Sequence, residues 1–430
     1  MHSTDSHKYR AGLAADQLPR LLPADGGAGP VGLAEHLARY GSLRSAGLSR
    51  PRREALLDEV DRSGLTGRGG AGFPAASKLA AVAAGHVPIV VANGTEGEPA
   101  SGKDKVLLAR SPQLVLDGAV LAAEIVGASQ VVIVVHHSAR AIVDAAAAER
   151  AQAVADRVRI RVMTAADRFV AGEASAVVHW IEDGVPAPTR KPPRISERGL
   201  SGRPTLVHNV ETLAHLALIG RYGACWFRSV GTPAEPGSML VTILGAVNEP
   251  CVCEIAIGTP VQETLRLAGG AAVPPQALLL GGYYGRWVDA AAARTLPFSS
   301  EGLAVLGAGP GAGLIAALPP DACGLAETAR VVRYLADESA GQCGPCLFGL
   351  HAIAGELQRL TEGRTSDLSL LRRWLDQVDG RGACGHPDGV AGLVRSALDV
   401  FEPELGQHAH GWCRGTRTAS VLPVPPRPRP

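Results

Sequence analysis

The sequence predicts an α/β domain with a parallel sheet, then a small α+β module, then a C-terminal helical region. Three observations predict this order. Apolar strand-like runs alternate with helical segments through the first half of the chain, which is the pattern of a parallel sheet with helical crossovers. Residues 238–280 change to short β-rich runs with one helical segment. From Ala326 onward the apolar spacing is helical again, and three clustered cysteines lie there.

The expected elements follow from apolar spacing along the chain. In the first domain we expect helices within 31–62 and at 75–84, 112–126 and 139–155, and strands at 87–92, 131–135 and 158–162. A Pro-rich connector at 186–204 precedes strands at 238–247 and 251–258 and a helix at 260–267. The chain then divides into a flexible tail (1–30), an α/β domain (31–236), an α+β domain (237–322), a helical bundle (323–415) and a disordered Pro/Arg tail (416–430).

Composition excludes several classes of protein. The 430 residues are 46 % hydrophobic with a net charge of +1, so the chain lacks the basic excess typical of nucleic-acid binding. We find no signal peptide and no transmembrane segment, because the longest uncharged stretch, Gly302–Pro320, is rich in Gly and Pro. We therefore expect a cytoplasmic protein with reduced thiols, in which clustered Cys indicates metal or redox chemistry.

A glycine-rich loop at residues 64–74 contains G-x-G-x-x-G at Gly67, Gly69 and Gly72. Glycines let a backbone approach a ligand closely, and a loop that opens a helix presents free N–H groups to an anion. The dinucleotide fingerprint requires a strand directly before the loop, whereas a helical segment precedes it here. The motif alone is therefore weak, and a tight helix-entry turn is the alternative interpretation.

A polar loop follows the first predicted strand and contains Asn93, Glu96 and Glu98. Ligands of open α/β sheets bind beyond the carboxyl ends of the strands. An Asn amide can pair with a ring edge, and carboxylates suit ribose or ribityl hydroxyls. The alternative is an exposed polar turn, with Lys103 and Lys105 beside it on a solvated face.

Taken together, these segments resemble the NADH-binding flavoprotein subunit of respiratory complex I and its relatives in NAD-reducing hydrogenases and formate dehydrogenases. The likeness runs from about residue 30 to 410 and includes SGLTGRGGAGFPAASK, VANGTEGEPASGKDK, FVAGEASAVVHWIEDGVP, GLSGRPTLVHNVETLA and DESAGQCGPCLFG. It implies an FMN-binding α/β domain, a small ubiquitin-like (soluble-ligand-binding) domain and a helical bundle with a [4Fe–4S] cluster.

The resemblance also implies site residues. It assigns FMN and nucleotide binding to Gly67, Arg68, Gly69, Gly70, Phe73, Lys78, Asn93, Gly172, Glu173, Lys191, Asn209 and Thr212. Glu96 and Glu98 would be the catalytic pair that lines the flavin and nicotinamide pocket. Cys343, Cys346 and Cys384 would hold the iron–sulfur cluster.

The cluster motif departs from the family pattern E-S-C-G-x-C-x-P-C, because Ala340 stands at the first ligand position. Three thiolates remain where a [4Fe–4S] cluster normally takes four. The alternatives are a three-iron cluster, a fourth iron held by water or Ser339, recruitment of Cys323 or His386, or no cluster.

The nucleotide site departs as well. Ala81 and Arg194 replace two aromatic residues that stack on adenine in the family, and Thr95 replaces its Asp. An Arg plane can stack on a base and an Ala cannot. We expect FMN binding to be better preserved than NADH binding.

The resemblance implies an NADH dehydrogenase subunit that moves hydride from NADH to FMN and then single electrons to an iron–sulfur centre. The acceptor would be a separate [2Fe–2S] or ferredoxin-like protein, and the chain would reach a membrane only through partners. The competing interpretation is a degenerate, non-catalytic paralogue that binds FMN or nothing and serves in assembly or electron relay.

Overall fold

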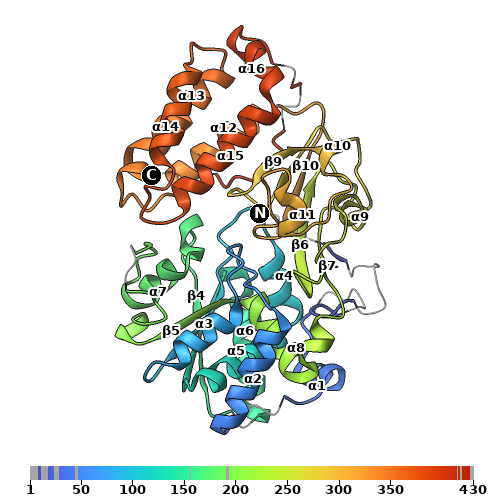
Figure 1. Ribbon diagram of the computed structural model, residues 1–430, viewed down its shortest axis with the longest axis vertical. Coiled ribbons are helices and arrows are strands. Elements are labelled where there is room, and N and C mark those ends of the chain that lie inside the picture. Colours follow the sequence, from blue (N-terminus) through green and yellow to red (C-terminus); the bar gives the residue numbers. More distant parts are fainter. Residues whose placement is uncertain are drawn as a thin grey trace.

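The computed structural model describes residues 8–10, 18–23, 29–43, 47–154, 156–189, 193–413, 415–416 and 419–426. A four-stranded sheet with flanking helices forms the lower part of the molecule in Figure 1. A six-stranded sheet lies above it on the right, and a helical bundle lies at the upper left beside the six-stranded sheet. No single helix among these residues is long and apolar enough to cross a membrane, and only the bent pair Lys103–Arg110 and Pro112–Val126 passes that test jointly.

The four-stranded sheet is parallel and has the order β4-β3-β2-β5. Its strands are β2 (Ile89–Gly94), β3 (Gln130–Val135), β4 (Arg159–Thr164) and β5 (Thr205–Asn209). Its helices are α1 (Leu33–Tyr40), α2 (Arg50–Ser63), α3 (Ala75–Ala83), α4 (Lys103–Arg110), α5 (Pro112–Val126), α6 (Arg140–Ala153), α7 (Ala174–Asp183) and α8 (Val210–Phe227). The apolar runs of β2 and β3 are buried because helices cover both faces of the sheet.

Helix α5 occupies the predicted range and is buried along its whole length. It packs closely against α8 because Gly118 has no side chain. A Cβ at Gly118 would lie 1.8 Å from the carbonyl oxygen of Leu213. This close contact brings α8, and with it the end of β5, against the core of the domain.

The second sheet has the order β1-β7-β6-β10-β8-β9. Its strands are β1 (Lys8–Arg10), β6 (Ser238–Gly245), β7 (Cys251–Ala256), β8 (Ala277–Leu280), β9 (Arg286–Asp289) and β10 (Leu314–Leu318). Strands β6 and β7 are antiparallel, whereas β10 runs parallel to β6. Its short helices are α9 (Val261–Arg266), α10 (Ala290–Ala293) and α11 (Ser300–Ala304). Mixed strands with short helices confirm the α+β character of this segment.

The C-terminal bundle contains α12 (Gly324–Asp337), a π-helical turn η4 (Pro345–Gly349), α13 (Leu350–Thr361), α14 (Leu368–Val378), α15 (His386–Val400) and α16 (Glu402–Ala409). Its core is a continuous apolar cluster of Leu, Val and Ala side chains. Helix α14 is strongly amphipathic and buries Leu371, Leu375 and Val378. The spacing of these residues at positions i, i+4 and i+7 explains why the sequence pattern predicts a packed helix.

The expectation of a flexible N-terminal tail is wrong for residues 18–23. Leu21 and Leu22 are fully buried. The backbone N–H groups of Arg20 and Leu21 donate to the buried carboxylate of Glu254, at 2.9 and 2.8 Å. The polar and Gly-rich composition of the tail hid this pair of leucines.

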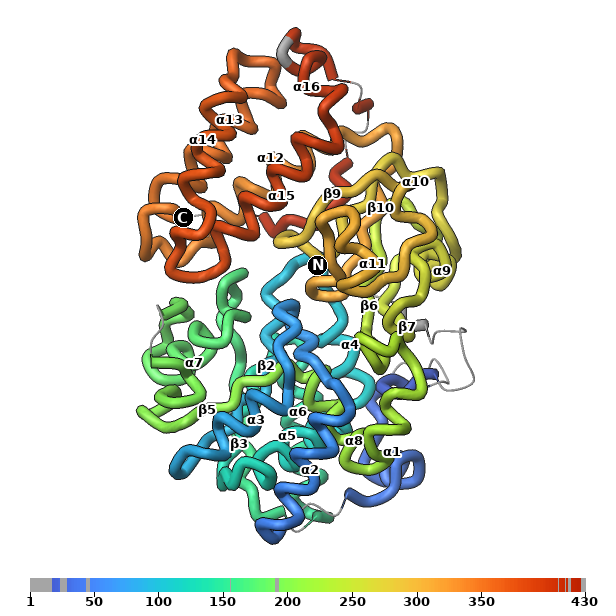
Figure 2. Tube along the Cα trace, viewed as in Figure 1, coloured from blue at the N-terminus to red at the C-terminus, as the bar shows by residue number. Residues whose placement is uncertain are grey.

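The expectation of a disordered C-terminal tail is wrong for residues 419–426, which we call the C-terminal strap. Leu422 is buried, and the N–H groups of Val421 and Leu422 donate to Glu327, at 2.9 and 3.0 Å. Figure 2 shows the red C-terminal trace between the helical bundle above and the α/β domain below. Pro residues suit such a segment, because an extended strap needs few backbone donors of its own.

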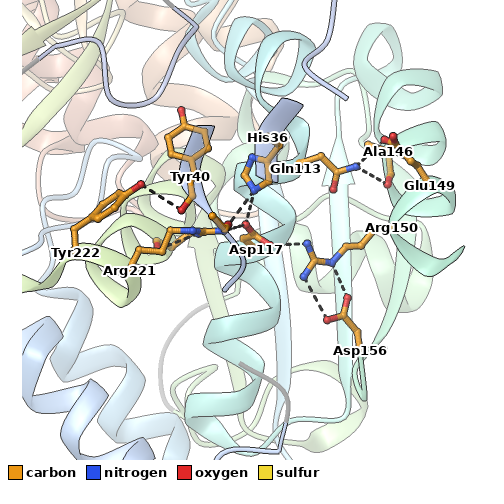
Figure 3. Close-up of polar contacts among 12 residues, drawn as sticks. His36, Tyr40, Gln113, Asp117, Ala146, Glu149, Arg150, Asp156, Arg221 and Tyr222 are labelled. Carbon is orange, nitrogen blue, oxygen red and sulfur yellow. Dashed lines mark hydrogen bonds and ion pairs between the residues drawn. The ribbon is translucent and has the colours of Figure 1, made fainter. Parts of the chain in front are cut away.

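A buried ion-pair cluster ties the outer helices of the α/β domain together (Figure 3). Asp117 of α5 bonds His36 at 2.7 Å and forms ion pairs with Arg150 and Arg221. Burial opposes ionisation of Asp117, but the His36 hydrogen bond and the two guanidinium groups hold its pKa below the ordinary range. Helices α1, α5, α6 and α8 are thereby linked at one charged group.

Candidate functional site

The predicted cofactor residues gather at the carboxyl ends of β2 and β5. These strands pair in register, so Asn93 lies beside Asn209. The Asn93 amide donates to the carbonyl of Gly172 at 2.9 Å, and the Asn209 amide donates to the Asn93 carbonyl at 3.3 Å. Three residues assigned by different motifs are therefore neighbours at one edge of the sheet. This is the edge where open α/β sheets bind ligands.

The glycine-rich loop connects α2 to α3 and lies against Asn209 and Thr212. The Arg68 N–H donates to the Thr212 hydroxyl at 2.9 Å. Gly70 has φ of 101°, in a region that favours glycine. A Cβ at Gly69 would lie 3.4 Å from the Cβ of Asn209. The loop thus follows a helix rather than a strand, but the fold brings it to the same edge.

The remaining predicted cofactor residues that the structure describes lie at several different places around this edge of the sheet. Lys78 donates to the carbonyl of Val207 in β5, at 2.7 Å. Glu173 caps the N-terminus of α7 by accepting from the N–H groups of Ser175 and Ala176, at 2.8 and 3.0 Å. Phe73 is 53 % exposed on the loop surface. Lys191 lies outside the described residues.

Sequence reasoning missed a buried charged network centred on Lys103. Lys103 is 3 % exposed, so the interpretation of a solvated face is wrong for it. Its ammonium donates to Asp104 at 2.7 Å, to Glu211 at 2.8 Å and to Asn209 at 3.3 Å. The Asn209 amide in turn donates to Asp104 at 2.6 Å. The scarcity of lysine in this Arg-rich chain was the available signal, since few lysines persist and this one orients Asn209.

Glu96 and Glu98 have different surroundings. Glu96 accepts hydrogen bonds from the Ser101 hydroxyl at 2.7 Å and from the N–H groups of Asp104 and Lys105, at 2.9 and 2.8 Å. It therefore binds the free N–H groups at the start of α4, as capping carboxylates do. Its own φ of 45° places it in a strained backbone region.

Glu98 is partly buried at the boundary between the α/β domain and the second sheet. Its two oxygens accept from the N–H of Tyr283, at 3.2 and 3.1 Å. Burial raises the pKa of Glu98 to about 8, although the Tyr283 hydrogen bond opposes the rise. A carboxyl with such a pKa holds a proton near neutrality. Its predicted catalytic role stays a prediction, and its contacts link two domains.

A cavity of about 510 Å³ lies next to the Glu96 loop. It is lined by the loops that follow β2, β3 and β4, by one residue each of α4 and α12, and by the C-terminal strap; these residues include Thr95, Glu96, Lys105, His136, Arg168, Tyr334 and residues 420–425. The Thr95 hydroxyl is buried without a hydrogen-bond partner among the described residues, although it borders this cavity. Neither the glycine-rich loop nor Asn209 lines this cavity. The cavity therefore shares Glu96 with the predicted site but opens on another side of the loop.

The three predicted cluster cysteines lie at one end of the bundle. Cys346 is buried in the π-helical turn η4, while Cys343 and Cys384 are partly exposed. Burial, and to a smaller extent the nearby Cys343 and Cys384, raise the pKa of the Cys346 thiol to about 12. Cys346 also has a side-chain hydrogen bond with Ser339, next to Ala340. Cys343 and Cys384 both influence the Cys346 thiol, so the three lie near one another at the π-helical turn, but their sulfurs are not as close as the ligands of one metal ion; this arrangement fits a cluster better than a single cation.

Two alternatives for the fourth ligand do not fit this structure. Cys323 precedes α12, whose 14 residues span roughly 20 Å and separate it from Ser339 and Ala340. His386 has both ring nitrogens engaged, one with the Leu335 carbonyl at 2.7 Å and the other with the Tyr284 hydroxyl at 2.5 Å. The alternatives that remain are a fourth iron held by water or by the Ser339 hydroxyl, a three-iron cluster, or no cluster.

The residues at the β2–β5 edge fit a flavin mononucleotide. A Cβ at Gly72 or Gly172 would meet no atom within 4 Å, so space is open on both sides of the edge. His208 Nε2, in β5, is buried with no partner in the described part of the chain. Amide, hydroxyl and backbone N–H groups are the donors and acceptors that a ribityl phosphate needs.

Comparisons with known proteins agree with this geometry. Residues 60–218 match the family model "Nuo51 FMN-binding domain", residues 240–282 match the SLBB domain, and residues 326–408 match the "NADH-ubiquinone oxidoreductase-F iron-sulfur binding region". The F 2 subunit of NADH-quinone oxidoreductase in Rhizobium meliloti is 28 % identical over 392 residues, 86 % of this chain and 92 % of that one. The F subunit of the same enzyme in Streptomyces coelicolor is 29 % identical over 396 residues, 86 % of each chain.

A solved structure agrees as well. The crystal structure of an NAD⁺-reducing [NiFe]-hydrogenase in the H₂-reduced state matches with a TM-score of 0.78 and 30 % identity. The match covers 83 % of this chain, and this chain spans 63 % of that hydrogenase chain.

Proposed function

Because the chain is a divergent member of the family of NADH-binding flavoprotein subunits, lacking one cluster cysteine, we propose that it transfers electrons from NADH through FMN to an iron–sulfur cluster. The observation that carries the proposal is the β2–β5 edge, where motifs far apart in sequence meet at Asn93, Gly172 and Asn209. Bound FMN would accept two electrons as a hydride and release them one at a time.

We propose distinct roles for the chain's own residues. The glycine-rich loop and Asn209 would hold the FMN phosphate and ribityl chain, and Lys103 would keep the Asn209 amide in place. Glu96 would position the loop after β2 by capping α4 rather than by touching the nicotinamide. Cys343, Cys346 and Cys384 would hold the cluster as three thiolates. Loss of the family's stacking aromatics at Ala81 and Arg194 predicts weak NADH affinity.

We propose further that electrons leave to a separate [2Fe–2S] or ferredoxin-like partner. Leu347 and Phe348 directly follow Cys346 and are 50 % and 75 % exposed, which places apolar surface beside the cluster thiols. Large exposed apolar groups of this kind mark contact surfaces. We propose that the chain works with this partner in the cytoplasm. It would lie at a membrane only as part of a larger complex.

The strand order of the second sheet supports the ubiquitin-like form of the small domain. A β6–β7 hairpin is followed by α9, and the last strand, β10, lies parallel to β6 in the middle of the sheet. The β1 pairing extends this sheet at its edge.

The experiment measures flavin, iron and electron transfer on the full-length protein. Anaerobically purified protein is expected to carry flavin absorbance, which NADH bleaches slowly, and to reduce ferricyanide with NADH. Asn209→Ala is expected to lose FMN without loss of iron, and Cys384→Ala to lose iron without loss of FMN. A colourless protein that fails to take up FMN would contradict the proposal.

A non-catalytic paralogue is the second candidate, and one observation favours it. Ala340 stands at the first ligand position of the cluster motif, so the usual set of four thiolates is incomplete. A protein that binds FMN but shows no bleaching by NADH or NADPH would support this second candidate.

A further inference from the structure

A cysteine–histidine group lies in the bundle away from the cluster thiols. The ligand atoms of Cys323, His408 and Cys413 all lie within 4.8 Å of one another. Cys323 Sγ is 3.2 Å from His408 Nε2. The three residues come from the start of α12, from α16 and from the segment after it. Cys323 and His408 are buried, and Cys413 is partly exposed.

Both sulfurs accept a backbone hydrogen bond. Cys323 is the N-cap of α12, and its Sγ accepts from the N–H of Ala326 at 3.3 Å. Cys413 Sγ accepts from the N–H of Gly415, also at 3.3 Å. Burial raises the pKa of the Cys323 thiol to about 12, although the Ala326 N–H opposes the rise, so a metal ion would displace the thiol proton on binding.

His408 and Glu404 complete the group from one face of α16. They are four residues apart, so their side chains lie one above the other on the helix. His408 has a hydrogen bond with the Thr361 backbone, which orients the ring while Nε2 points toward Cys323. Metal-binding histidines are commonly oriented by such a second bond. A carboxylate oxygen of Glu404 is 3.9 Å from Cys323 Sγ, but Glu404 lies outside the group of three whose ligand atoms are all within 4.8 Å of one another, so it would have to move closer to bind the same ion.

We propose that Cys323, His408 and Cys413 bind a structural Zn²⁺ ion, with Glu404 as the fourth ligand. Two thiolates, an imidazole and a carboxylate suit the tetrahedral preference of zinc, whereas Mg²⁺ and Ca²⁺ prefer oxygen ligands. The site is independent of the proposed electron transfer and of the cluster. Helix α12 separates it from Ser339 by roughly 20 Å.

The ion would fasten the C-terminal strap to the bundle. Cys413 precedes the strap, which hydrogen-bonds Glu327 and lines the cavity beside Glu96. The chain passes tightly over Cys323 at Gly415, where a Cβ would lie 2.8 Å from the Cys323 Cβ. One ion at this point would join α12, α16 and the strap.

Metal analysis of the full-length protein tests the proposal. We expect one zinc per chain after desalting, and its loss in Cys413→Ser and His408→Ala. Glu404→Gln is expected to bind zinc more weakly. Cys225→Ser, which changes an exposed cysteine elsewhere, is the matched control and is expected to keep zinc. Cys384→Ala is expected to lose iron and keep zinc, which separates this site from the cluster.

A second measurement does not depend on the variants' folding. Wild-type protein is stripped with a chelator and reloaded with Co²⁺, whose thiolate charge-transfer absorbance reports bound cysteines. Chelation is also expected to speed hydrogen exchange in residues 411–426 and at the start of α12. Wild-type protein without zinc, or with a Cys323–Cys413 disulfide in its place, would overturn the proposal, as would zinc retained in Cys413→Ser and His408→Ala.

Discussion

At the scale of single residues, the structure assigns contacts that residue type alone did not reveal. Glu96 and Glu98 are two positions apart, and the resemblance assigns both to one pocket. The backbone at Glu96 has a φ of 45°, so the two residues do not follow an extended strand. Glu96 caps α4, whereas Glu98 accepts a hydrogen bond from Tyr283.

Glu98 predicts a pH dependence of stability. Its folded-state pKa of about 8 lies above the ordinary value near 4.3, so its contribution is complete below pH 4 and is lost as pH rises to about 8. We expect the free energy of unfolding of the wild-type protein to fall over this pH window. The free energy of unfolding of Glu98→Gln is expected to fall less. Urea unfolding at several pH values measures both, with exposed Glu301→Gln as control. Equal slopes in wild type and Glu98→Gln would refute the assignment.

Ala340 predicts a gain of function at the cluster. A fourth thiol at this position, next to Ser339 and Cys346, would complete the usual set of four ligands. Ala340→Cys is expected to raise iron per chain and to slow cluster loss in air. Iron and sulfide analysis with electron paramagnetic resonance measures this, and Ser339→Ala tests the hydroxyl as the native ligand. No change in iron content in Ala340→Cys would argue against a cluster.

At the scale of elements, several predicted boundaries hold closely. The helix at 112–126 has the predicted limits, and the strands β2, β3 and β4 begin and end within two residues of those expected. Apolar runs bounded by polar turns predict such elements well, because burial on both faces selects them. The pairing of Asn93 with Asn209 was not available from spacing, because it depends on β5 joining the sheet beside β2.

The α5–α8 contact predicts a steric effect. Gly118→Ala would place a methyl group 1.8 Å from the Leu213 carbonyl oxygen, which forces two buried helices apart. We expect a loss of about 1–3 kcal/mol in the free energy of unfolding. Gly355→Ala in α13 is the matched control, because its Cβ would meet no atom within 4 Å. For Gly355→Ala we expect the free energy of unfolding to rise by about 0.4–1 kcal/mol. Chemical denaturation that ranks the two variants equally would contradict this packing.

At the scale of the whole molecule, long-range polar contacts hold the domains and terminal segments together. Leu240 of the second sheet donates to Glu211 of α8 at 2.9 Å, and Glu98 reaches Tyr283 across the same boundary. The C-terminal strap bonds Glu327, and the Tyr283 hydroxyl donates to Pro423. Tyr283 thus contacts both the α/β domain and the strap.

The Asp117 cluster predicts acid sensitivity of the α/β domain. Because the pKa of Asp117 is depressed in the folded state, its contribution is present above the unfolded value near 3.9 and is lost as pH falls below it. Asp117→Asn is expected to cost about 3–5 kcal/mol near neutral pH, because Arg150 and Arg221 lose their buried partner. The free energy of unfolding of Asp117→Asn should also decrease less than that of the wild type as the pH falls. Thermal and urea unfolding across this pH range measures both, and exposed Asp144→Asn is the control.

The sequence alone determined the alternation that makes the parallel sheet, the order of the three structural regions and the cysteines at 343, 346 and 384. These depend on local spacing and on motifs of adjacent residues. Only the tertiary structure decided that Lys103 is buried, that the strap is packed and that Cys323 meets His408 and Cys413. Cys323, His408 and Cys413 are separated by up to 90 residues, and no local sequence pattern predicts that they meet. Helix α16 packs against α13 and α15, which also pack against α12, and this arrangement brings the three side chains together because helices bury their apolar faces and carry polar side chains with them.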